Sequence, residues 1–307
     1  MMSQGNCKKK LHQLFQKLTA SRWDLAFIKE SLEDIVSGKS IHFIPVHNLY
    51  ANEFWFADPF ILDVTDEYIY VLAEAMPSTS HKGVIAKLTI QRNIMTIVKV
   101  DIILDEPWHL SFPDIIRKDG KTYVMPKAAY SKQLHLYELT ENDTQLKKVK
   151  TICNDIVWDS TLTDFFGERL LFTAHQNDYY LDIYRWDEKQ ELFTLSHSIA
   201  SDKQNMRMAG ALFKFGNKTY CPSQISTPYN YGIGVDLKEI GHINGEWILT
   251  SIRRINPPKG LLMNGLHTFN TYKGFTIVDI HEYNHLMGLI INRLVALKKQ
   301  IKAKLKS

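Results

Sequence analysis

Three aspartates and one histidine stand at or near the starts of short apolar runs, at similar places along the sequence. They are Asp58, Asp114, Asp159 and His267. Carboxylates gathered in one place can perform glycosidic chemistry, because one can protonate a leaving oxygen while another activates a nucleophile. An aspartate before a strand is also a common turn cap. The chemical interpretation therefore depends on a fold that brings these side chains together.

Five copies of one pattern carry these residues. In each copy a short apolar run, a polar turn and a second apolar run follow one another, which predicts a β-hairpin. The first runs begin near residues 58, 112, 159, 210 and 267, a spacing of roughly 45 to 57 residues that is typical of propeller blades. Further strand-like runs follow the first four copies. We therefore predict an all-β, five-bladed β-propeller with short flanking basic amphipathic helices, and the repeat period argues against the alternative of a β-sandwich.

The two ends of the chain are basic, whereas the long middle is nearly balanced in charge. We expect a basic helical extension over residues 1–22, the propeller over 23–285 and a basic amphipathic helix over 286–307. The last of these has an apolar stripe at helical spacing, formed by Ile290, Leu294, Leu297, Ile301 and Leu305. This helix either attaches to an anionic membrane surface or packs its stripe on the propeller with its lysines in solvent.

The composition is that of an ordinary folded domain. Of the 307 residues, 45% are apolar and 23% are charged, which excludes global disorder, collagen and coiled coil. The net charge of +4 is too small to indicate nucleic acid. Three scattered cysteines, Cys7, Cys153 and Cys221, fit a reducing compartment, and no apolar signal core or spanning stretch is present. We expect a cytoplasmic protein, peripheral on the inner membrane face if the C-terminal helix binds lipid.

An ordered set of motifs resembles one carbohydrate-related family. The chain resembles the N-terminal domain of glucosamine inositolphosphorylceramide transferases and its bacterial polysaccharide-biosynthesis relatives, and more distantly the arabinanase and β-xylosidase type of propeller glycosidases. The motifs are Phe-Ala-Asp-Pro-Phe at 56–60, Glu74, Lys-Gly-Val-Ile-Ala at 82–86, His-Leu-Ser-Phe-Pro at 109–113, Tyr-Val-Met-Pro at 123–126, Asp-Ser-Thr at 159–161, Arg-Met-Ala-Gly at 207–210, Gln224, Tyr-Gly at 231–232 and His-Thr-Phe-Asn at 267–270. The resemblance covers residues 23–280 and implies a carbohydrate ligand.

One position departs from the family pattern. The resemblance implies a glutamate after the methionine–proline step of blade two, where this chain has Lys127. If that glutamate is the general acid of the family, Glu74 or Asp114 would have to replace it here.

In a propeller the innermost strands line a central channel, so polar residues at matching repeat positions would converge there. As catalytic candidates we take Asp58 as base, Asp159 as a tuning group, and Glu74 or Asp114 as acid. Candidate substrate-binding residues are His109, Ser111, Lys127, Arg207, Gln224, Tyr231, His267 and Asn270. Arg207 could clamp a phosphate or carboxylate, or form a structural ion pair. Trp55 and Trp108 could stack on a sugar, or pack between blades.

We therefore expect a carbohydrate-active propeller in cell-surface polysaccharide or glycolipid biosynthesis, with glycosyl transfer at the central channel. A non-catalytic glycan-binding or scaffold module is the alternative, and a glycoside hydrolase is a minor one. The expected partners are a sugar, a nucleotide sugar or a lipid-linked glycan, with no nucleic acid. No cofactor is predicted. The resemblance leaves open a channel metal ion, since similar propellers hold calcium or sodium.

A zinc-protease pattern, His-Glu-x-x-His, occupies residues 281–285. The chemistry needs both histidines on one helical face and a third ligand. No histidine, aspartate, glutamate or cysteine follows His285, and the pattern begins directly after a predicted strand. We interpret it as a coincidence at a strand-to-helix junction.

Overall fold

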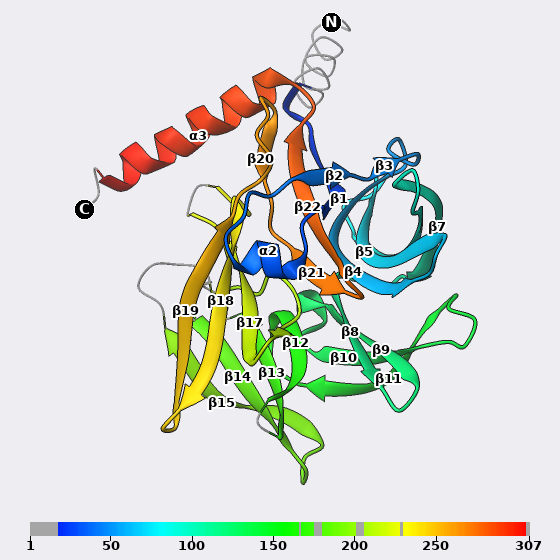
Figure 1. Cartoon of the computed structure of the whole chain (residues 1–307), viewed down its shortest axis with the longest axis vertical. Helices are drawn as coiled ribbons and strands as arrows, with labels where there is room; N and C mark the ends of the chain where they lie inside the picture. Colours follow the sequence, from blue (N-terminus) through cyan, green and yellow to red (C-terminus); the bar gives the residue numbers. More distant parts are fainter. Residues whose placement is uncertain (1–17, 166, 175–179, 201–205, 228–229, 305–307) are drawn as a thin grey trace, which may run out of the picture.

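The computed structural model describes residues 18–165, 167–174, 180–200, 206–227 and 230–304. Their strands form five sheets arranged as the blades of a ring, antiparallel except for one short parallel strand at the edge of the first blade (Figure 1). The predicted all-β, five-bladed β-propeller is confirmed. Residues 1–17 of the expected N-terminal helical extension over residues 1–22 lie outside the described residues. Of the rest, Leu18 and Thr19 are helical, whereas Ser21 and Arg22 already belong to the first strand, so the extension ends earlier than expected.

Each of the first four blades is a meander of four strands in chain order. Blade one consists of β4 (Phe54–Val64), β5 (Tyr68–Pro77), β6 (Val84–Gln91) and β7 (Thr96–Leu104), with the short β3 (His47–Asn48) beside β7. Blade two consists of β8 (Ser111–Lys118), β9 (Lys121–Lys127), β10 (Leu134–Leu139) and β11 (Leu146–Cys153). Blade three consists of β12 (Trp158–Phe165), β13 (Glu168–Ala174), β14 (Tyr180–Asp187) and β15 (Leu192–Ala200). Blade four consists of β16 (Phe213–Phe215), β17 (Lys218–Ile225), β18 (Gly234–Ile243) and β19 (Glu246–Ile255).

Blade five joins the two ends of the chain. Its C-terminal strands are β20 (Met263–Gly265), β21 (Phe269–Tyr272) and β22 (Phe275–Tyr283). The N-terminal strands β1 (Ser21–Ile28) and β2 (Phe43–Pro45) complete the sheet, and β1 pairs with β22 from Ser21 opposite Tyr283 to Ile28 opposite Thr276. The closing strand was not predicted, and it begins two residues before the expected start of the propeller. The ring is thus closed by hydrogen bonds between segments from opposite ends of the sequence.

The first strands of three blades share a local distortion. Asp58, Phe112 and Asp159 have positive φ angles of 49°, 46° and 51°, and the register of each strand shifts at that point. Such β-bulges re-aim a side chain. Asp58 and Asp159 are therefore structural equivalents. Asp114 is not, because Phe112 takes that place in blade two.

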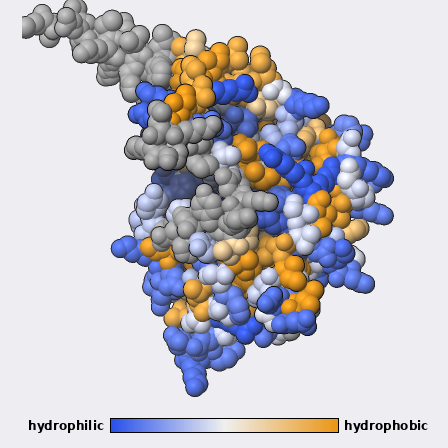
Figure 2. All heavy atoms as spheres, turned by 90° about the vertical axis from the view of Figure 1, so that its left-hand side faces the viewer, coloured by the Kyte–Doolittle hydropathy of each residue, from blue (hydrophilic) through white to orange (hydrophobic). Residues whose placement is uncertain are grey.

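The helix α3 (Leu286–Lys304) follows β22 and projects from the ring (Figure 1). Figure 2 looks at the side towards which α3 projects, and apolar side chains gather at the top of this view, at the level of the helix. Among the described residues, the remaining helical segments are the single turns α2 (Leu32–Val36) and η1 (Ala129–Ser131), together with the helical residues Leu18 and Thr19. In the described part of the chain, no helix has both the length and the hydropathy to span a membrane.

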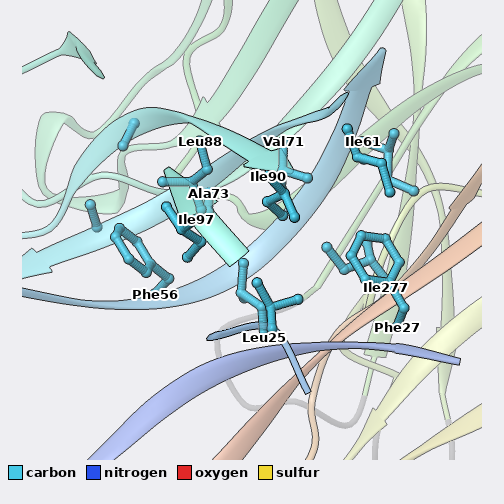
Figure 3. Close-up of a cluster of buried hydrophobic side chains, with 14 of the residues drawn as sticks. Leu25, Phe27, Phe56, Ile61, Val71, Ala73, Leu88, Ile90, Ile97 and Ile277 are labelled. Atoms are coloured by element: carbon cyan, nitrogen blue, oxygen red, sulfur yellow. The ribbon is translucent and has the colours of Figure 1, made fainter. Parts of the chain in front are cut away.

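Apolar clusters between the blades form the core. One cluster joins blade five to blade one, where Leu25 and Phe27 of β1 and Ile277 of β22 pack with Val71 and Ile61 (Figure 3). All five side chains are at most 3% exposed. Because β1 supplies part of this core, its attachment is stabilised by burial as well as by strand pairing.

Candidate functional site

Charged side chains from all five blades meet at the inner ends of the strands. Asp58 lies on β4, Glu74 on β5, Lys127 at the end of β9 and Asp159 on β12. The charges of Asp58, Lys127 and Asp159 each act on the pKa of Glu74, which shows that these groups are near one another. The structure therefore brings together residues from distant repeats, as predicted from the repeat positions.

Blade five contributes a line of two carboxylates with a histidine between them. His267 Nε2 lies 3.3 Å from Asp58 Oδ1, and His267 Nδ1 lies 2.8 Å from Asp279 Oδ2. All three residues are at most 6% exposed. Burial opposes a charge on His267, but Asp279 and Asp58 outweigh it and raise its pKa. The imidazolium thus balances one of the two carboxylate charges beside it.

Backbone and hydroxyl donors fix the same line. The carboxylate of Asp58 accepts hydrogen bonds from Phe112 N at 3.1 Å and from Thr268 Oγ1 at 2.8 Å. Asp279 accepts from the backbone N–H groups of Asp58, His267 and Thr268, at 2.9 to 3.0 Å. Asp58 is therefore held in one orientation by blades two and five.

The ligand atoms of Asp58, His267 and Asp279 lie within 4.8 Å of one another, which raises the question of a metal ion. Donors of the protein already contact these groups. Every carboxylate oxygen already accepts a hydrogen bond from Phe112, Thr268, His267 or Asp58.

Glu74 and His109 form a second pair. Gly83 N donates to His109 Nδ1 at 2.9 Å, so the neutral ring carries its proton on Nε2, which lies 3.3 Å from Glu74 Oε1. Burial first, and then the Asp58 charge, raise the pKa of Glu74 well above its usual range. Burial lowers the pKa of His109. The site therefore favours the protonated form of the Glu74 carboxyl group.

A glycine permits this pair to form. A Cβ atom on Gly83 would lie 2.6 Å from Leu110 O, 2.8 Å from Glu74 Oε1 and 2.9 Å from His109 Cε1. Such distances are shorter than van der Waals contact, so only glycine lets the second and third strands of blade one approach His109 in this way.

Asp159 is paired with two cations. Arg207 Nε contacts Asp159 Oδ2, and Lys127 Nζ forms an ion pair with Oδ1 at 3.1 Å. Burial opposes the charge on Asp159, but Arg207 and Lys127 outweigh it and lower its pKa to about 2. Of the two expectations for Arg207, a clamp for an anionic ligand or a structural ion pair, the structure shows the ion pair. Asp159 is ionised at neutral pH and cannot act as an acid.

Lys127 occupies the repeat position of Glu74. Glu74 pairs across the sheet with Ala57, one residue before Asp58, and Lys127 pairs with Ser111, one residue before Phe112. The residue that departs from the family pattern is therefore an ion-pair partner of Asp159 at the site. Glu74 is the acid that remains available.

Aromatic rings line the site beside these charges. The charged ends of Lys127 and Arg207 lie 5.3 and 5.4 Å from the ring centroid of Trp158, and Arg207 also lies 5.3 Å from that of Tyr231. The ring of Trp23 lies 4.0 Å from that of His267. Aromatic faces of this kind suit the apolar faces of a sugar ring.

Gln224 and Tyr231 extend this wall. Gln224 Nε2 donates to the Tyr231 hydroxyl at 3.4 Å, and the Tyr231 ring lies 5.4 Å from His267. Both were predicted as substrate-binding residues, and the structure places them next to Arg207 and His267.

Asp114 and Asn270 act between blades instead. Asp114 accepts a hydrogen bond from Leu162 N at 3.0 Å, and burial raises its pKa to about 7. Asn270 accepts from Ala211 N at 2.9 Å and donates to Pro59 O at 2.8 Å. These bonds use the polar atoms that were expected to serve catalysis or sugar binding.

Three residues at the site were not predicted. Asp279 lies in the middle of the apolar strand β22. Because a buried aspartate needs a partner, its position within an apolar run could have indicated a polar site. Trp23 and Trp158 were missed as aromatic platforms. Trp108, one of the two tryptophans expected to stack on a sugar, packs instead against an apolar cluster.

The zinc-protease pattern does not form a metal site. His281 lies in β22 beside Trp23, with ring centroids 4.9 Å apart, and His285 lies beyond the end of the strand. The two histidines do not share a helical face, so the interpretation as a coincidence is confirmed.

Comparison with known proteins gives the family. The model of the family described as glucosamine inositolphosphorylceramide transferase 1, N-terminal, matches residues 44–245. The chain belongs to this family. The resemblance predicted from the ordered motifs is thus confirmed. The match spans blades one to three and most of blade four, and the blade that supplies His267 and Asp279 lies beyond it.

The curated relatives are plant proteins. Glucosamine inositolphosphorylceramide transferase 1 of Oryza sativa subsp. japonica is 28% identical over 200 residues, which is 62% of this chain and 27% of the relative. The protein of the same name from Arabidopsis thaliana is 32% identical over 111 residues, 36% of this chain and 14% of the relative. The chain therefore spans about a quarter or less of the length of these relatives.

Solved structures of propeller glycosidases share the fold. An exo-β-1,3-galactanase of Phanerochaete chrysosporium has a TM-score of 0.54 at 8% identity, over 85% of this chain and 64% of that one. A family 117 glycoside hydrolase of Zobellia galactanivorans has a TM-score of 0.52 at 11% identity, over 87% of this chain and 92% of that one. At these identities the likeness concerns the fold alone.

Proposed function

We propose that this chain transfers a sugar at the central site, in the synthesis of a glycolipid or a surface polysaccharide. The observation that carries the proposal is Glu74, a buried carboxyl with a strongly raised pKa, beside Asp58. One protonated and one ionised carboxyl at the same site are what glycosidic chemistry needs. Membership of a transferase family and the glycosidase fold support the same class of chemistry.

Each carboxyl has a role in the proposed step. Glu74 gives its proton to the leaving oxygen of the donor as the bond from that oxygen to the anomeric carbon breaks. Asp58 takes the proton of the acceptor hydroxyl as its oxygen bonds to the same carbon. Burial also raises the pKa of Asp58, but the His267 charge and the Thr268 hydroxyl oppose this and favour the ionised form that a base needs.

The remaining residues position the ligand. Lys127 and Arg207 hold Asp159 and present cationic groups beside Trp158, where they attract a phosphate of the donor. A nucleotide sugar or a lipid-linked sugar phosphate fits this combination of charge and aromatic surface. The location that we propose is the cytoplasm, in keeping with Cys153 and Cys221, which are both free thiols.

Thermal melting against nucleotide sugars, sugar phosphates and free sugars tests the proposal. A ligand at 100 times its dissociation constant stabilises the native state by about 2.7 kcal/mol, which is roughly 4 °C for a chain of this size. We expect one donor to raise the melting temperature of the wild type and of Glu74→Gln. The exposed Asp164→Asn is the matched control, since its side chain is 79% exposed.

Product analysis of the same donor with acceptor alcohols, by NMR, then separates chemistry from binding. Transfer or donor hydrolysis by the wild type and Asp164→Asn, but not by Glu74→Gln, supports the assignment of the acid. If the wild type binds the donor but cleaves no bond, a glycan-binding module is favoured. Lys127, at the repeat position of Glu74, supports that alternative. If none of the nucleotide sugars, sugar phosphates or free sugars changes the melting temperature of the wild type, sugar binding at this site is refuted.

A further inference from the structure

The helix α3 carries an apolar stripe that faces away from the propeller. Seven large apolar side chains of α3 are 42–60% exposed. A rotation of 100° per residue places all of these except Val295 on one arc of about 100°. The side chains on this arc are Leu286, Met287, Ile290, Leu294, Leu297 and Ile301. An exposed apolar stripe of this length marks an interaction surface.

The first turn of the helix contacts the body of the protein. Leu289 and Ala296 are 2% and 5% exposed, and a Cβ on Gly288 would lie 3.0 Å from Leu18 O and from Tyr283. Packing of the stripe on the propeller, one of the two expectations from the sequence, is therefore wrong. The helix is held at its first turn and exposes its apolar stripe.

The charges of α3 have one sign. Its sequence contains no aspartate or glutamate, and Arg293 and Lys298 flank the stripe on either side. Lys299 and Lys302 add to the basic surface, and all four side chains are exposed. A second copy of the same helix would bring lysines against lysines. An anionic lipid surface is complementary in both charge and hydropathy.

We propose that α3 lies on an anionic bilayer, with its apolar stripe among the lipid headgroups and its basic residues on the phosphates. It is too polar to cross the bilayer and has the composition of an interfacial helix. The stripe supplies the apolar burial, and the lysines supply selectivity for negative lipid.

The attachment also orients the candidate site. Strand β22 carries Asp279 and ends at Tyr283, which contacts the start of α3. Four residues of strand span about 13 Å, so the site lies a short distance from the seat of the helix. If the proposed function holds, the sugar donor or acceptor is carried by a lipid of that membrane.

Flotation of the full chain with vesicles tests the lipid contact without any assay of sugar transfer. The vesicles are phosphatidylcholine alone, or phosphatidylcholine with about one third phosphatidylglycerol. We expect binding to the anionic vesicles only. Each basic residue near such a surface contributes about 1 kcal/mol, or about 5-fold in affinity, so the three changes Lys298→Gln, Lys299→Gln and Lys302→Gln should weaken binding roughly 100-fold together.

Two further variants complete the test. Leu294→Ser, Leu297→Ser and Ile301→Ser together should abolish binding with an unchanged melting temperature, because these side chains are exposed. The matched control is a triple variant with Lys118→Gln, Lys147→Gln and Lys214→Gln. It removes the same amount of charge from the blades and should bind the vesicles like the wild type. Failure to float, equal binding to neutral vesicles, or a stripe-dependent dimer in light scattering without lipid binding would each overturn the proposal.

Discussion

Replacement of Asp159 by asparagine should destabilise the ring strongly. The side chain of Asp159 is 4% exposed, and those of its partners Arg207 and Lys127 are 11% and 16% exposed. Removal of one member of a buried ion pair leaves the other charge without compensation and costs about 3 to 5 kcal/mol. For a chain of 307 residues this corresponds to a fall in melting temperature of roughly 5 to 8 °C.

The pH dependence of stability checks the same interaction by a second route. The pKa of Asp159 is lowered to about 2 in the folded state, so its contribution is present above pH 4 and is lost as the pH falls towards 2. The lowered pKa corresponds to about 2 kcal/mol. Asp159→Asn should lack this part of the acid destabilisation of the wild type.

Urea unfolding followed by tryptophan fluorescence measures both quantities. The cycle of Asp159→Asn, Arg207→Gln and the double variant isolates the pair, and the second substitution should cost less after the first. A loss below about 1 kcal/mol for Asp159→Asn at pH 7, or additive costs in the cycle, would refute the view that this ion pair is buried and coupled.

Two further predictions concern Glu74 and Gly83. Because burial raises the pKa of Glu74, the wild type should lose stability as the pH rises above about 4.5, where only the unfolded state ionises. In urea titrations between pH 5 and 8, the stability of Glu74→Gln should depend less on pH than that of the wild type. Identical stability profiles would contradict the raised pKa of Glu74. Gly83→Ala should lower stability by about 1 to 3 kcal/mol, because its Cβ would lie 2.6 Å from Leu110 O. The control Gly241→Ala, with open space around the new methyl group, should melt like the wild type.

The blades could be predicted from the sequence because each is built from consecutive strands. A hairpin has its apolar runs and its turn in one stretch of chain, and five copies reinforce one another. The closing strand β1 has no such local signal. It begins with polar residues, its partner lies about 250 residues away, and nothing in either segment specifies the pairing.

The site was predicted in part for a related reason. Asp58 and Asp159 could be found because they hold equivalent repeat positions, whereas Asp114 stands two residues beyond its own bulge and binds the next blade. Asp279 was hidden within an apolar strand. The partner choices of Lys127 and His267 depend on distances between blades, which no periodicity encodes.

The closure of the ring by β1 has a consequence for synthesis of the protein on the ribosome. Leu25 and Phe27 are core residues, yet their strand partner β22 is made about 250 residues later. At about 5 to 20 residues per second, the first strand waits roughly 10 to 50 s for that partner. His267 and Asp279 arrive only with the last blade, so no part-made chain holds a complete site. The candidate site is therefore assembled only after β22 has been made and has paired with β1.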